Sequence, residues 1–157
     1  MGTGYHLLVL AHVLCVIGGV GALAYRGLYL SLARRAAPEG TAGVVAVTAQ
    51  VGTLGELLFY AAFIFGLAAV GDSHSVWKFS QAWVSAAFAV FFVEIGILHG
   101  WIRRNERAYR DAAAAASPNV SALVGLERRI GLGWGAFNIL IVVLVYLMVF
   151  KPGGPGG

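Results

Sequence analysis

Charged side chains are scarce in this chain of 157 residues, where Asp, Glu, Lys and Arg together make up only 11%. Soluble domains typically contain about a quarter of such residues. Apolar residues account for 59% of the chain, and the mean hydropathy is +0.81. This composition excludes an ordinary water-soluble globular domain and indicates a protein whose surface meets lipid.

Cysteine is nearly absent as well. Cys15 is the single cysteine, and it lies within an apolar run. An intrachain disulfide and a multi-cysteine metal site are therefore excluded. The serines show no nucleophile elbow, and no motif assembles Ser, His and an acid. The sequence accordingly predicts no catalytic residue and no metal site built from cysteines.

Four apolar stretches reach the roughly 20 residues that a helix needs to cross the hydrocarbon core of a bilayer. They run over about 5–25, 44–70, 79–101 and 130–150. Residues 102–116 read as a helical continuation of the third stretch, and Ser117-Pro118 as its end and the cap of the next helix. We expect an all-α membrane protein, a four-transmembrane-helix antiparallel bundle, with one domain over 1–150 and a disordered Pro/Gly tail over 151–157.

The basic residues are distributed unevenly over the connections. Nine of the eleven lie at or near the first and third connections. They are Arg26, Arg34, Arg35, Arg103, Arg104, Arg107, Arg110, Arg128 and Arg129. The positive-inside rule places both connections in the cytoplasm and both termini outside, so the third connection forms a basic cytoplasmic extension. The net charge of +4 thus reflects topology rather than a nucleic-acid partner.

Polar residues inside the spans are the only chemical lead. Counting from the centres of the connections, at 1.5 Å per residue, brings Glu56, Glu94 and Asn138 to similar depth, with Arg26 within reach. Intramembrane carboxylates are costly and usually face protein or water. This candidate buried polar layer is either a proton- or cation-binding site of a small carrier or channel, or a structural device that fixes helix register.

The histidines raise the possibility of haem or a metal. His12 lies near the outer end of its span and His99 near the inner end of the third, so the two are too far apart along the membrane normal to be axial ligands of one iron. His74, in the outer turn, could approach His6 or His12 and leaves a weak outer metal site open. We predict no cofactor, with a haem or quinone redox protein using His12 as an alternative.

Small residues four apart form grooves in which helices can approach closely. The pairs are Gly18 and Ala22, Gly96 and Gly100, and Gly131 and Gly135. Such grooves can serve the bundle itself, a second copy, or another membrane protein. Besides the lipid bilayer, these are the partners that the sequence allows.

One resemblance covers most of the chain. The opening His12-Val13-Leu14-Cys15-Val16-Ile17-Gly18-Gly19 and the basic end at Arg34-Arg35 resemble the start of a bacterial family of four-span predicted integral membrane proteins of unknown function, DUF twenty-two sixty-nine. The second hairpin, with Glu56, Gly66, Trp77 and Trp83 before Arg103-Arg104, has a similar layout. The resemblance implies the bacterial plasma membrane and no catalytic residues. We expect a non-catalytic accessory, assembly or interaction protein.

Overall fold

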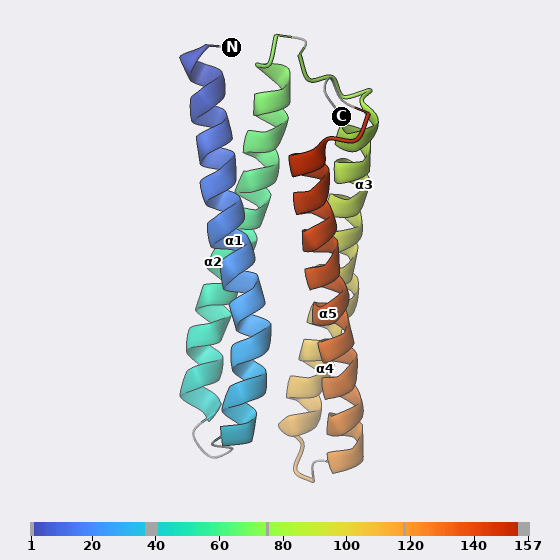
Figure 1. Ribbon diagram of the computed structural model, residues 1–157. Helices are drawn as coiled ribbons and strands as arrows, with labels where there is room; N and C mark the ends of the chain where they lie inside the picture. The colour runs from blue at the N-terminus through green and yellow to red at the C-terminus, as the bar shows by residue number, and fades with distance from the viewer. Residues whose placement is uncertain (1, 37–40, 75, 118, 154–157) are drawn as a thin grey trace. The chain divides into compact units, whose positions relative to one another are not determined.

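The computed structural model describes residues 2–36, 41–74, 76–117 and 119–153, and side chains outside 26–49. The chain is helical: α1 is Thr3–Ala36, α2 is Thr41–Gly71, α3 is Ala82–Gly96, and α5 is Val120–Phe150 (Figure 1). A π-helix, η2, covers Ile97–Ile102 and joins α3 to α4, Arg103–Ala113. Four helices are long and apolar enough to cross a membrane. The predicted all-helical class and the four candidate spans are confirmed.

The start of α5 lies close to the helix start expected at Ser117-Pro118, and α5 includes the apolar span expected from about 130. It begins at Val120, and its cap is Asn119. The Asn119 side-chain oxygen accepts hydrogen bonds from the Ala122 N–H at 3.2 Å and from the Ser121 hydroxyl at 2.7 Å. Such a side chain satisfies one of the backbone donors that a helix start leaves unpaired. The helix therefore extends about ten residues beyond its apolar part.

The chain divides into two compact units, residues 1–79 and 80–157. In the first unit, residues early in α1 contact residues late in α2, and the helices approach most closely around Gly19 and Gly55. A Cβ on Gly19 would lie 2.9 Å from the backbone nitrogen of Phe59 and 3.1 Å from the Gly55 carbonyl oxygen. Small residues permit this backbone contact, which gives helix association its dispersion energy in lipid. The groove predicted at Gly18 and Ala22 does face α2.

Hydrogen bonds hold the loop that follows α2. The Ser73 side chain is fully buried, and its hydroxyl donates to the Val70 carbonyl oxygen at 2.7 Å and accepts from the Trp77 N–H at 3.0 Å. The Trp77 indole N–H donates to the Tyr5 hydroxyl at 2.9 Å and so fastens the loop to the start of α1. These hydrogen bonds tie Ser73 and Trp77 to the helices of the first unit.

In the second unit, α3 and η2 pack against α5. The closest approach is at Gly133, where an added Cβ would lie 2.7 Å from the Trp101 ring and 2.8 Å from Ile102. The Trp101 indole N–H also donates to the Arg129 carbonyl oxygen at 2.9 Å. A Cβ on either member of the predicted pairs Gly96 and Gly100 or Gly131 and Gly135 would meet no atom within 4 Å. These four glycines therefore take no part in the packing of the unit.

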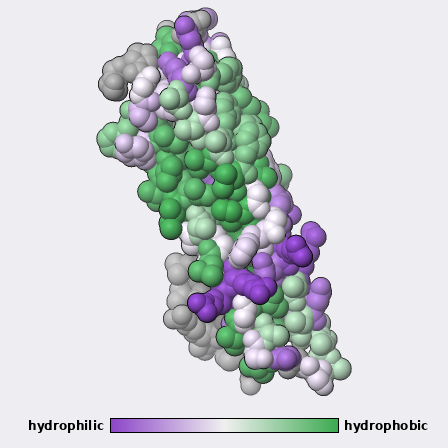
Figure 2. All heavy atoms as spheres, turned by 90° about the vertical axis from the view of Figure 1, so that its right-hand side faces the viewer, coloured by the Kyte–Doolittle hydropathy of each residue, from purple (hydrophilic) through white to green (hydrophobic). Residues whose placement is uncertain are grey.

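Hydrophobic and hydrophilic residues separate along the second unit. On the face shown in Figure 2, hydrophobic residues form a broad region, and hydrophilic residues gather towards the end at which α4 lies. α4 contains no buried residue. It is the helical continuation that the sequence predicted after the third span, and it ends at Ala113.

Candidate functional site

Glu94 is the most unusual side chain that the structure describes. It lies in α3 within the apolar stretch Ala82–Ala113, and its exposed fraction is 0%. Among the residues that the structure describes, neither carboxylate oxygen has a hydrogen-bond partner. Buried polar groups in proteins are almost always hydrogen-bonded, and each exception needs an explanation. Glu94 therefore makes no hydrogen bond to His99, the next ionisable residue along the chain, and His99 is exposed.

Contacts on both sides of Glu94 give its register against α5. Ala82 lies beside Gly153, and Ile102 lies beside Gly133. Counting along the two helices between these contacts places Glu94 level with Ile141, a buried residue of α5. Our expectation had put Glu94 level with Asn138.

Asn138 itself is exposed. It is three residues from Ile141 and therefore points about 60° away around the helix, at 100° per residue. Gly131, Gly135 and Val142 are exposed as well, and their spacing puts them on the same stripe of α5 as Asn138. The structure thus separates the Asn138 amide from the buried carboxyl group of Glu94 and places it among small and apolar residues.

Glu56 is buried in the first unit, with an exposed fraction of 5%. It follows Gly55, the point at which α2 meets α1 most closely. Glu56 and Glu94 belong to different units, so their common depth stays a prediction. The Arg26 side chain lies outside the described residues.

His12 joins α1 to α2. Its Nδ1 is 2.6 Å from the Ala62 carbonyl oxygen, and because a carbonyl only accepts, Nδ1 carries the proton and donates it. The ring lies over Gly66, where a Cβ would be 3.0 Å from Cε1 and Nδ1. Gly66 thus leaves the space that the imidazole fills. The hydrogen bond makes His12 a clamp between the helices.

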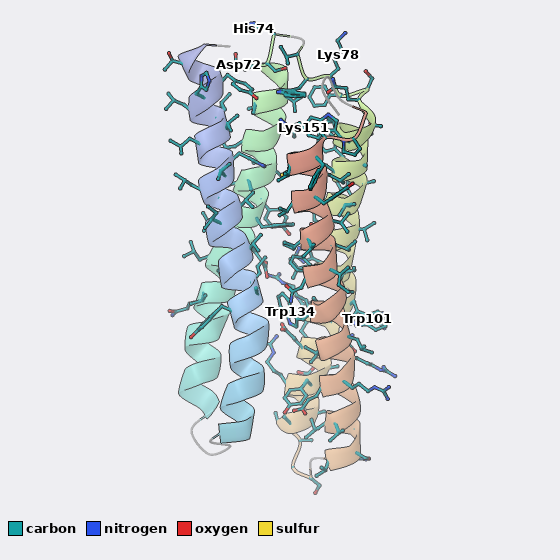
Figure 3. All side chains as sticks on the ribbon, in the orientation of Figure 1. Asp72, His74, Lys78, Trp101, Trp134 and Lys151 are labelled. Atoms are coloured by element: carbon teal, nitrogen blue, oxygen red, sulfur yellow. The ribbon has the colours of Figure 1, made fainter. Side chains whose placement is uncertain are left out.

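The remaining histidines occupy separate places. His6 Nδ1 is 3.0 Å from the Gly2 carbonyl oxygen, so its contact is local. His74 lies in the loop after α2 with φ 50° and is exposed, near Asp72 at one end of the first unit (Figure 3). Within the described residues, no group of three or more His, Cys, Asp or Glu side chains could hold a metal ion.

The basic residues predicted to set topology are found on α4 and the first turns of α5. Arg104, Arg107, Arg110, Arg128 and Arg129 are exposed, and Arg103 is half-buried. Arg34 and Arg35 belong to α1, but their side chains lie outside the described residues. The last positions of the predicted tail, 154–157, lie outside them too.

Two features of the second unit had no signal in the sequence. The π-helix η2 interrupts the rod three residues after Glu94, and π-turns occur frequently at functional sites. The indole N–H of Trp134 is buried without a hydrogen-bond partner. Figure 3 labels this residue on α5 and Trp101 on the neighbouring η2. Neither the extra residue in the turn nor the missing partner follows from residue type.

Comparison with known proteins gives no match to a family model, to a curated protein or to a solved structure.

Proposed function

We propose that this chain is an integral membrane protein whose four spans form an antiparallel bundle, with both termini outside and the basic connections in the cytoplasm. The bacterial inner membrane is the proposed location, in keeping with the family resemblance. The excess of Arg on two connections supports this orientation. Its proposed role is that of a non-catalytic accessory or assembly protein, which binds another membrane helix through the exposed stripe of α5.

The observation that carries this role is the position of Asn138. Its amide is exposed, although it lies near the middle of an apolar helix. Polar amides at such depth associate helices by hydrogen bonds across the interface. Gly131 and Gly135 lie on the same stripe, and nothing within 4 Å would meet a side chain added there. A second helix could therefore approach the backbone of α5 closely at the level of the amide.

The contribution of this amide can be bounded. Interhelical hydrogen bonds in membranes average about 0.6 kcal/mol and reach about 1.7 kcal/mol. At about 1.4 kcal/mol per factor of ten, loss of the amide should weaken association by roughly threefold to twentyfold. A large side chain in place of Gly135 should weaken association more than loss of the amide does, because it keeps the partner backbone away.

Cysteine cross-linking in membranes tests the proposal. In a Cys15→Ser background, Val142→Cys places a thiol on the stripe, one turn from Asn138. Val143→Cys is the matched control, because the next residue points about 100° away around the helix. We expect cross-linking to a partner from position 142, little from 143, and a loss at 142 when Gly135→Leu is added. Equal cross-linking from both positions would argue against a specific surface.

Copurification in mild detergent identifies the partner. A purified complex with the mass of two chains indicates self-association, and a complex of any other mass indicates that the partner is a different protein. Gly135→Leu should release this partner, whereas Val143→Leu, also exposed on α5 but pointing about 100° away from Val142, should retain it. A lone monomer under conditions that preserve other membrane complexes would refute the accessory role.

A further inference from the structure

Among the described residues of the second unit, the helical elements packed against α3 offer no group that could compensate an ionised Glu94 carboxylate. The helical elements that pack against α3 are α5 and η2. Ile141 stands level with Glu94, and the neighbouring buried residues of α5, Phe137 and Leu144, are apolar as well. α5 contains no Asp, Glu, His, Lys or Arg between 130 and 150. The one titratable side chain of η2 is the exposed His99.

An isolated charge in such a place is strongly disfavoured. An ionised carboxylate removed from water without a partner costs far more than the protonated acid, so the group takes up a proton instead. Inside a membrane, ionisable side chains without such a solution are rare, and they mark functional sites by default. The geometry around Glu94 therefore favours its neutral form.

A purely structural role does not explain the residue. A buried polar side chain fixes helix register through the hydrogen bonds that it makes. Both oxygens of Glu94 lack such a bond, so a leucine would fill the same space at lower cost. What a carboxyl group offers here and an apolar side chain does not is the reversible binding of a proton.

From this combination of complete burial, two unpartnered oxygens and an apolar facing helix, we propose that Glu94 is a proton-binding site within the α3–α5 pair. The carboxylate takes one proton from water at the membrane surface, an O–H bond forms, and the acid releases the proton again when the pair opens to water. The adjoining π-helix supplies a turn of weaker backbone geometry next to the site. This site is independent of Glu56 and of the lateral association proposed above.

Reaction with a lipophilic carbodiimide tests the proposal on the full-length protein in liposomes. A protonated carboxyl group passes its proton to a carbodiimide nitrogen, its oxygen adds to the central carbon, and rearrangement gives a stable N-acylurea. No atom leaves, so the peptide that contains Glu94 gains the mass of one carbodiimide. We expect this adduct at neutral pH and its decline in alkaline medium.

Matched variants locate the reaction. Glu94→Gln should lose the adduct, and Glu56→Gln should retain it at Glu94. A water-soluble carbodiimide should instead modify the exposed Asp111. This second adduct shows that carbodiimide chemistry and the peptide mapping work on the protein. Absence of an adduct at Glu94 at every pH, with Asp111 modified, would overturn the proposal. So would a yield at Glu94 that does not change with pH.

Infrared spectroscopy supplies a second readout that does not depend on access of a reagent. An acid without hydrogen bonds has a carbonyl-stretching band at the high-frequency end of the carboxylic-acid range, and Glu94→Gln should remove it. Ile141→Thr places a hydroxyl level with Glu94 and should lower the frequency of this band, whereas Ile141→Val should leave it in place. A wild-type spectrum with no such band would refute a neutral Glu94.

Discussion

Gly19 offers the sharpest test of how the first unit is held together. A Cβ at this position would meet the Phe59 nitrogen at 2.9 Å, the Gly55 carbonyl oxygen at 3.1 Å and the Leu58 carbonyl carbon at 3.2 Å. These are backbone atoms of α2, so no rotamer change can relieve the contact. To reach ordinary van der Waals contact at 3.4 Å, α2 must retreat by about 0.5 Å.

The expected cost of Gly19→Ala follows from this displacement. Overpacking a tight contact costs typically about 1–3 kcal/mol. The better helix propensity of alanine returns up to about 1 kcal/mol. Gly21 is the matched control on the same helix, because a Cβ there would meet nothing within 4 Å. Gly21→Ala should therefore be neutral or slightly stabilising.

Reversible unfolding in mixed micelles, followed by circular dichroism, measures both variants. We expect Gly19→Ala to lower the free energy of unfolding and Gly21→Ala to leave it unchanged or raise it. The difference between the two should lie at about 1–3 kcal/mol, because the propensity gain is common to both. Equal stability of the two variants would show that α1 and α2 do not meet at Gly19.

The same unfolding assay tests two hydrogen bonds of this unit. His12→Leu removes the bond to the Ala62 carbonyl and should cost about 0.6–1.7 kcal/mol, whereas His6→Leu, whose bond lies within one turn of α1, should cost less. Equal costs would contradict a clamp between the helices. Trp77→Phe and Tyr5→Phe should show a coupling energy of about 0.5–1.5 kcal/mol in a double-mutant cycle, and strict additivity would show that their bond contributes nothing.

The spans were predictable because their signal is long and physical. About 20 apolar residues in a row have few soluble explanations, and all four such stretches became helices. Hydropathy does not show the polar start of α5, because it reports the part of a helix that meets lipid. The capping signal near Ser117-Pro118 does indicate this start, and Asn119 is the residue that caps the helix. The start of a helix and the part of it that crosses the membrane are therefore indicated by different features of the sequence.

The contacts between helices were harder to predict from the sequence. A spacing of four shows that Gly131 and Gly135 share a face, but it does not say which face a neighbouring helix occupies, and the close approach is at Gly133 instead. The depth of Glu94 was counted from the centre of a connection, and the centre shifts when its two arms differ in length. The error amounts to three residues: the count from the sequence puts Asn138 level with Glu94, and the structure puts Ile141 there.

The helical segment formed by α3, η2 and α4 is longer than the hydrocarbon core of a bilayer is thick. It contains 32 residues, Ala82–Ala113, and at 1.5 Å per residue it is about 48 Å long. The hydrocarbon core of a bilayer is about 30 Å thick, so in the proposed membrane arrangement roughly 18 Å of this segment, or about twelve residues, would project from it. This is about the length of α4, so its arginines would be held near the membrane surface by a helix rather than by a flexible loop. Any tilt of α3 within the lipid would swing these charges sideways across the headgroups.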